Sequence, residues 1–290
     1  MKLQLTTLLY LIGNAVLILF RTIQIIFFTE PGSAFLKTSS LPINIILVVV
    51  SLLLMVSVFT NALYKPRMPK EIKTKSVPSV AISVFAGVLY IISGSIYLAG
   101  NIQTGGLFFT ISLFGGLTCF LYGFTEFSGF EFPRIATLVW IGVWVYEFIL
   151  SYAYYSTRPL RFRTILETLA IAFVLLFFIS FGKLKSGVKQ SRNIQLLYPL
   201  GLIASTLCFV SLVPEWLALL LKHGAKVSDS CISQPALLAA GSFTAFVSLY
   251  CFKKQPREVK NIEDELPETE MPFYMESFEK FHINPREDDK

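Results

Sequence analysis

The chain has 290 residues, of which 54% are hydrophobic and only 15% are charged, and its mean hydropathy is +0.63. This composition excludes a water-soluble globular domain, in which about a quarter of the residues are charged. The net charge of +6 is unevenly distributed, because residues 1–252 hold 18 Lys and Arg against 8 Asp and Glu, whereas residues 253–290 hold 7 against 11. The basic residues of the first part gather in short segments between apolar runs. We therefore expect them to face anionic lipid headgroups and not nucleic acid.

Apolar runs of roughly twenty residues predict transmembrane helices, because a helix of that length spans the hydrocarbon core of a bilayer. Lipid offers no partners to backbone polar groups, so the predicted fold is an all-α integral membrane bundle. Eight such runs occur, and a seven-span arrangement without the fourth or the eighth is the alternative. The expected spans are Leu5–Phe28, Ile43–Leu63, Val77–Ala99, Leu107–Phe124, Ile135–Tyr155, Ile165–Phe181, Leu196–Leu221 and Pro235–Phe252.

The seventh run is the least regular of the eight. Pro214 followed by Glu215 is expected to kink or end its helix, because proline cannot donate the backbone hydrogen bond of a helix interior. Residues Trp216–Leu221 would then lie along the membrane interface.

The orientation follows from the Lys and Arg content of the short loops, since positive residues are retained on the cytoplasmic side. The loops after the second and the sixth runs are the most basic, and with eight spans they face the same side. This places both chain termini in the cytoplasm. Three arginines between the fifth and sixth runs are unusual for an outer loop. The absence of Asn-x-Ser/Thr sequons and the bias toward Lys, Ile and Phe favour a bacterial plasma membrane.

The two halves of the membrane region, 1–128 and 129–252, show a weak likeness. Residues Thr7–Gly13 resemble Thr137–Gly142, and Gly115–Phe120 resemble Gly241–Phe246. Repeats of four helices keep the same orientation, so these matches predict a parallel 4+4 tandem duplication. The alternative is that Leu, Phe, Gly and Thr recur by composition alone.

Small residues recur at helical spacing in the third and fourth runs. Such stripes let helices approach closely in lipid, so we expect packing faces inside the bundle. A substrate path lined by small residues is the alternative, and the same faces would permit a homo-oligomer. The residues are Ser79, Ser83, Gly87, Gly94, Ser112 and Gly116.

Ionisable residues inside a membrane are candidates for function, because burying a charge costs several kcal/mol. Glu147 in the fifth run and Arg21 in the first should reach similar depths and form an ion pair across the bundle. One interpretation is structural, with the pair fixing helix register or Arg21 extending to the outer surface. The other is a carboxylate that binds substrate. Asn14 is a further candidate, as a donor of an interhelical hydrogen bond.

A second ion pair is expected at the outer interface. Glu167 lies within one turn of the start of the sixth run, where Arg163 or Arg161 can neutralise it.

Motifs of catalysis and metal binding are absent from the sequence. The two histidines, His223 and His282, lie outside the apolar runs, and no HExxH, GxSxG or Walker sequence occurs. Asp229 is the only aspartate before residue 253, so the paired aspartates of magnesium-dependent membrane transferases are missing. We therefore predict neither an enzyme nor a metal or cofactor site.

The segment 253–290 is acidic and interrupted by proline, which predicts a largely disordered cytoplasmic tail. Within 272–282, Tyr274, Phe278 and Phe281 form an apolar stripe typical of a short amphipathic helix. This helix would dock on the basic inner loops or on a protein partner; a free solubilising tail is the alternative.

These observations favour a small-solute transporter or permease component. The alternative is a non-catalytic signalling or scaffold protein that acts through its basic cytoplasmic loops and its tail. The first predicts that Glu147→Gln abolishes binding or uptake, and the second that truncation of the tail abolishes function.

Overall fold

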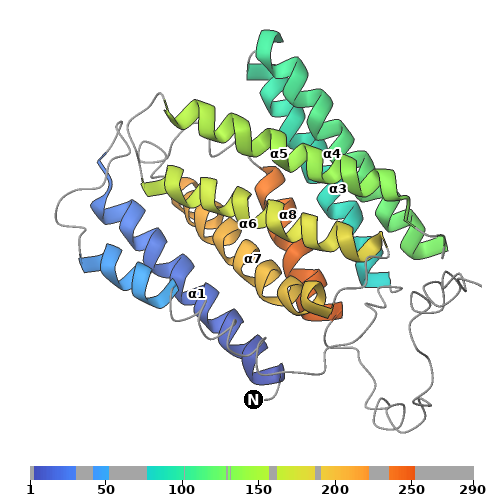
Figure 1. The fold of residues 1–290 in the computed structure, drawn as a ribbon. Helices are drawn as coiled ribbons and strands as arrows, with labels where there is room; N and C mark the ends of the chain where they lie inside the picture. The colour runs from blue at the N-terminus through green and yellow to red at the C-terminus, as the bar shows by residue number, and fades with distance from the viewer. Residues whose placement is uncertain are drawn as a thin grey trace, which may run out of the picture. The chain divides into compact units, whose positions relative to one another are not determined.

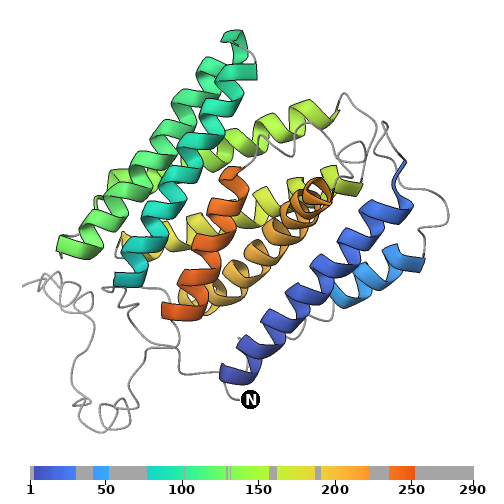
Figure 2. The same ribbon diagram turned by 180° about the vertical axis from the view of Figure 1, so that it is seen from behind.

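The computed structural model describes residues 3–30, 42–51, 77–100, 102–128, 130, 132–156, 162–186, 191–221 and 235–251. These residues form an all-α bundle of eight helices, drawn in Figures 1 and 2. The helices are α1 (Leu3–Phe28), an unlabelled helix Pro42–Ser51, α3 (Val77–Gly100), α4 (Ile102–Ser128), α5 (Arg134–Ser156), α6 (Phe162–Lys185), α7 (Ser191–Leu220) and α8 (Pro235–Phe246). Helix α8 continues into a π-helical turn, η4 (Val247–Cys251).

Six of these helices are long and apolar enough to cross a membrane: α1, α3, α4, α5, α6 and α7. Their outward faces carry large exposed apolar side chains, such as Leu19, Phe124 and Ile149, as expected for a surface in contact with lipid. The chain is therefore a polytopic membrane protein with a helical bundle.

The described residues support six full spans, two fewer than the eight expected. The helix Pro42–Ser51 covers only the first part of the second expected span, and residues 52–63 lie outside the described part of the chain. The eighth expected span is represented by a shorter apolar helix, Pro235–Leu249, whose end takes the wider π-helical form. A π turn gains less length per residue than an α turn.

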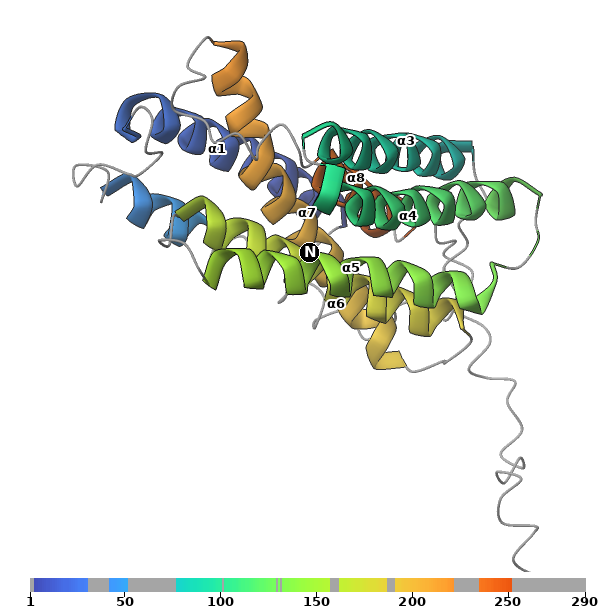
Figure 3. The same cartoon turned by 90° about the horizontal axis from the view of Figure 1, so that it is seen from above.

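Helix α7 continues through both of its prolines, Pro199 and Pro214, so the expected break at Pro214 is not observed. Each proline removes one backbone hydrogen bond, but packing against neighbouring helices tolerates this loss in a membrane bundle. Helix α7 contacts α1, α6 and α8, and Figure 3 shows it within the bundle. In its most apolar window 78% of the residues are buried, against 28 to 44% for the other five spans. Residues Trp216–Leu220 therefore belong to this helix.

Contacts between helices define two ends of the bundle. Tyr10 of α1 meets Ser205 of α7, and farther along both helices Leu17 shares an apolar cluster with Val210, so α1 and α7 run parallel. Lys185 of α6 meets Glu126 of α4 close to the ends of both helices. We call the end that holds this ion pair the Lys185 end. The opposite end, which contains the last turns of α1 and α7 and the first turns of α6, is called the Arg21 end.

Three expectations remain predictions. The tail 253–290 and its helix at 272–282 lie outside the described residues, which belong to a single compact unit. The duplication of 1–128 in 129–252 and the direction of insertion into the membrane are also untested.

Candidate functional site

The small residues of the third and fourth spans lie along the contact between α3 and α4. A Cβ atom added to Gly94 would lie 2.8 Å from Ser112 Cβ, and one added to Gly87 would lie 3.1 Å from the carbonyl oxygen of Gly116. Ser83 lies opposite Gly123 in the same contact, 3.2 Å from its added Cβ. The Ser83 hydroxyl donates to the Ser79 carbonyl oxygen at 2.6 Å, so this hydroxyl is satisfied within α3. The stripe therefore supports close packing of two helices.

The buried guanidinium of Arg21 takes part in a polar network at the Arg21 end. Its Nη1 donates to Gln24 Oε1, and Gln24 Nε2 in turn donates to Asn44 Oδ1 on the helix Pro42–Ser51. Arg21 is 5% exposed and Gln24 is fully buried. The network joins α1 to the short helix through two buried side chains of α1 and the half-buried Asn44.

Two buried carboxylates, Glu167 on α6 and Glu215 on α7, belong to the same end. Glu167 is 2% exposed and Glu215 is 4% exposed. A small apolar cluster shows that these carboxylates lie near Arg21 along the bundle. It consists of Leu17, Leu47 and Val210, with Leu166 packed against them. Glu167 directly follows Leu166, Arg21 is one turn beyond Leu17, Asn44 is one turn before Leu47, and Glu215 is five residues beyond Val210. We call Arg21, Gln24, Asn44, Glu167 and Glu215 the Arg21 cluster.

The expected pair of Glu147 with Arg21 is not the arrangement that the structure shows. Helix α1 packs against α7, whereas α5 packs against α4 and α6, so the two charges lie on different helix contacts. The other expected partners of Glu167 cannot be placed: Arg161 lies outside the described residues, and the side chain of Arg163 is not described.

Glu147 lies near the middle of α5, on the helix face that also carries Trp140 and Trp144. Its side chain is half-buried. Tyr90 of α3 lies close enough to Glu147 for an electrostatic interaction, and the rings of Tyr90 and Trp144 are 6.0 Å apart in an edge-on contact. Glu147 thus lies within electrostatic range of α3.

Hydroxyl groups connect the level of Glu147 with that of the Arg21 cluster. Ser151 Oγ of α5 lies 3.4 Å from Thr168 Oγ1 of α6. Thr168 adjoins Glu167, and Ser151 is one turn from Glu147, a rise of about 6 Å along the helix. Polar side chains therefore continue from the Arg21 end to the middle of the bundle.

Asn14 was expected to donate between helices but bonds within its own helix. Its Nδ2 donates to the Tyr10 carbonyl oxygen at 2.9 Å, and among the described residues its Oδ1 accepts no hydrogen bond. The contact between helices is made by Tyr10 instead, whose hydroxyl lies 2.6 Å from Ser205 Oγ of α7. Hydropathy indicates how deep a residue lies but not which side chain of a helix reaches its neighbour.

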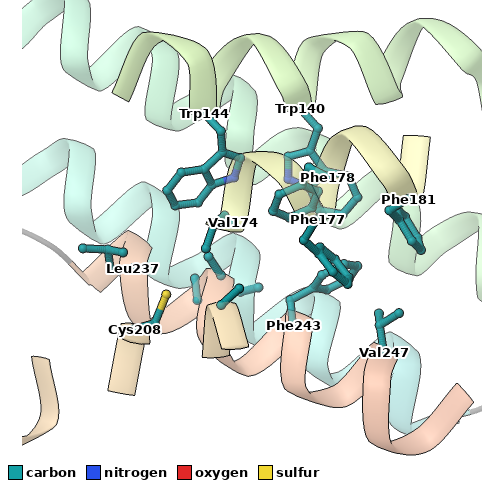
Figure 4. Packing of buried hydrophobic residues seen from close by; sticks show 14 of the residues in the cluster. Trp140, Trp144, Val174, Phe177, Phe178, Phe181, Cys208, Leu237, Phe243 and Val247 are labelled. Atoms are coloured by element: carbon teal, nitrogen blue, oxygen red, sulfur yellow. The ribbon is translucent and has the colours of Figure 1, made fainter. Parts of the chain in front are cut away.

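The half of the bundle toward the Lys185 end is filled by aromatic rings, as Figure 4 shows. Trp140 of α5 stands 4.7 Å from Phe178 of α6 and 4.9 Å from Phe243 of α8, measured between ring centroids. All three side chains are at most 2% exposed. Tyr122 of α4 and Phe181 of α6 extend the same cluster. This interior is closely packed and apolar.

An ion pair lies beside this aromatic cluster at the Lys185 end. Lys185 Nζ donates to Glu126 Oε1 at 3.0 Å and stands 5.1 Å from the centroid of the Tyr122 ring. The Glu126 side chain is almost fully buried. Glu126 was not among the expected candidates because the fourth expected span ends at Phe124, whereas α4 extends to Ser128.

Glu215 and Gln24 were also missed as candidates. Glu215 was considered only as the residue after Pro214, where the helix was expected to break. Gln24 lies three residues after Arg21, a helical spacing that could have identified it as a partner.

Comparisons with protein-family models, curated proteins and solved structures gave no match for this chain. Within the described part of the chain, no three His, Cys, Asp or Glu side chains are grouped closely enough to hold a metal ion. The function must therefore be argued from the arrangement of the buried polar groups.

Proposed function

We propose that this protein is a small-solute transporter whose substrate enters the bundle at the Arg21 end. The observation that carries the proposal is the burial of Arg21, Glu167 and Glu215 in a helical membrane bundle, each at most 5% exposed. Charged groups are costly in this environment, and those that membrane proteins contain commonly mark binding sites and substrate pathways.

The layered interior supports this function. Polar side chains extend from the Arg21 cluster to Glu147, whereas aromatic rings and the pair of Glu126 with Lys185 fill the other half. A carrier that works by alternating access has, in each of its end states, one side open to substrate and the other closed. The packed aromatic rings and the ion pair of Glu126 with Lys185 are suited to closing the bundle at the Lys185 end.

The proposed orientation of the bundle in the membrane rests on the distribution of basic residues. The loops at the Lys185 end are the most basic, which favours the cytoplasm for that end and for both termini. The Arg21 end would then face the outside of the cell, and the bacterial plasma membrane is the proposed location. Substrate would reach the Arg21 cluster from outside.

Glu215→Gln tests the proposal, because it removes one buried charge and keeps the size of the side chain. Purified protein is heated in detergent with a panel of amino acids, amines, carboxylates and sugars, and a solute that binds raises the melting temperature. The same solute, radiolabelled, should enter proteoliposomes. We expect Glu215→Gln to weaken binding at least about tenfold, since loss of 1.4 kcal/mol has that effect and a charge contact in a binding site contributes more.

Glu30→Gln is the matched control, because Glu30 is an exposed carboxylate at the same end of the bundle. It should leave binding and uptake unchanged. Uptake that Glu215→Gln leaves at the level of the unaltered protein would overturn the assignment of the Arg21 cluster.

The scaffold alternative makes the opposite demand on the tail. Removal of residues 253–290 should leave solute uptake by proteoliposomes intact if the protein is a transporter. If no solute on the panel binds and a cellular phenotype depends on the tail, the scaffold function replaces the one proposed here.

A further inference from the structure

Glu147 has an environment that the Arg21 cluster does not share. Its carboxylate forms no ion pair with a described residue, and it lies in the middle of α5, away from Arg134 at the start of that helix. Tyr90, which is only 2% exposed, lies within electrostatic range of Glu147, and its hydroxyl approaches the Trp144 side chain. A carboxylate inside a membrane bundle that has no counterion among the described residues indicates a position suited to a cation.

The other neighbours of this carboxylate are aromatic. Trp144 precedes Glu147 by three residues, and its ring lies parallel to that of Phe178, 6.1 Å away. Tyr146, the adjacent residue on α5, lies 5.9 Å from Phe108 of α4. Figure 4 shows Trp144 and Phe178 extending from α5 and α6 into the same interior region. Aromatic faces carry negative potential and attract organic cations.

We propose that Glu147, Tyr90 and Trp144 form a binding site for an organic ammonium ion. This inference rests on the proposed transport function and names the chemical class of its substrate. The carboxylate balances the charge of the ion, and the aromatic faces contact its alkyl groups. An inorganic cation would require about six oxygen ligands, and the site offers a single carboxylate and one phenol. An anion would be repelled by Glu147.

The Arg21 cluster favours the same class of solute. Its side chains include two buried carboxylates, Glu167 and Glu215, which carry the sign of charge that attracts an ammonium ion. The hydroxyls of Ser151 and Thr168 lie between this cluster and the level of Glu147.

The test uses choline and 3,3-dimethyl-1-butanol, which have nearly the same shape and differ in charge. Binding to the full chain in detergent is measured by titration calorimetry, which does not depend on transport. We expect saturable binding of choline and none of the neutral alcohol. Glu147→Gln should weaken choline binding at least tenfold, Trp144→Leu should also weaken it, and Glu30→Gln, which alters an exposed carboxylate, should leave it unchanged.

A second measurement applies to the unaltered protein, in case Glu147→Gln fails to fold. Dicyclohexylcarbodiimide modifies carboxyl groups in apolar surroundings, and mass spectrometry reports modification of the peptide that contains Glu147. Choline should protect this peptide, and the neutral alcohol should not. Equal effects of the two compounds, or modification that neither choline nor tetraethylammonium reduces, would overturn the ammonium site; the latter result would indicate a site for protons only.

The two proposals can fail separately. Binding of choline without uptake by proteoliposomes would support the site and contradict transport. Uptake of a different solute that depends on Glu215, without binding of any ammonium ion, would support transport and overturn the ammonium site.

Discussion

The charged side chains buried in the described part of the bundle lie on different helices: Arg21 on α1, Glu126 on α4, Glu167 on α6 and Glu215 on α7. Arg21, Glu147 and Glu167 could be identified from the sequence, because a charge within an apolar run is conspicuous. Their neighbours could not, because hydropathy gives the depth of a residue and not the direction in which its side chain points. Glu126 and Glu215 were not predicted as candidates. Glu126 follows the expected end of the fourth run, and Glu215 follows Pro214, where the helix was expected to break, so both carboxylates were expected to reach water.

The ion pair of Glu126 and Lys185 allows a prediction at this scale. Lys185→Met should destabilise the protein by about 3–5 kcal/mol, because it leaves the almost fully buried Glu126 carboxylate without this counterion. Glu126→Gln should cost less, because the Lys185 side chain is 21% exposed. The double variant should be markedly more stable than either single variant. Thermal unfolding in detergent measures the three differences.

Additive losses in the double variant would contradict this interpretation of the pair. Lys183→Met provides a control, because this residue is exposed on the same last turn of α6 and its loss should change the melting temperature little.

At the scale of the helix, the sequence predicted where most helices lie, since a run of about twenty apolar residues is stable as a helix in the hydrocarbon core of the membrane. It failed at Pro214, because the local rule for proline takes no account of the three neighbouring helices that enclose α7. The second run extends from the helix Pro42–Ser51 into residues outside the described part of the chain, so its full length stays a prediction. Tertiary packing decides whether a local weakness ends a helix.

Gly201 in α7 gives a test of this packing. A Cβ atom there would lie 2.8 Å from the Phe177 ring and 3.0 Å from the carbonyl oxygen of Thr244, so α6 and α8 would have to move apart. We expect Gly201→Ala to cost about 1–3 kcal/mol, as overpacking in a core does. Gly142→Ala is the matched control, because nothing lies within 4 Å of its added Cβ. Equal melting temperatures for the two variants would show that α7 is packed more loosely than described.

At the scale of the whole molecule, composition was sufficient to predict a polytopic helical membrane protein. The contacts among helices were beyond it, because lipid-facing and interior faces of these helices are both apolar, which leaves little amphipathic signal. The position of the candidate site therefore became apparent only from the three-dimensional arrangement of the helices.

Reporter fusions test the orientation of the whole chain. A green fluorescent protein that fluoresces only in the cytoplasm, fused after residue 75 or after residue 290, should be bright in both cases. An alkaline phosphatase active only outside should be inactive at both positions. Opposite results at the two positions would show an odd number of crossings between them, as the seven-span alternative requires.

The close approach of α3 and α4 has a mechanical consequence. With almost no side-chain volume between Gly87, Gly94 and their neighbours on α4, the two helices cannot slide or separate easily and should move as one rigid body. This hairpin carries Tyr90 beside Glu147 and, farther along, Glu126 in contact with Lys185. A tilt of this hairpin that changes the surroundings of Glu147 must also shift the contact of Glu126 with Lys185. Binding of a solute near Glu147 and opening of the bundle at the Lys185 end would then be coupled through the movement of α3 and α4.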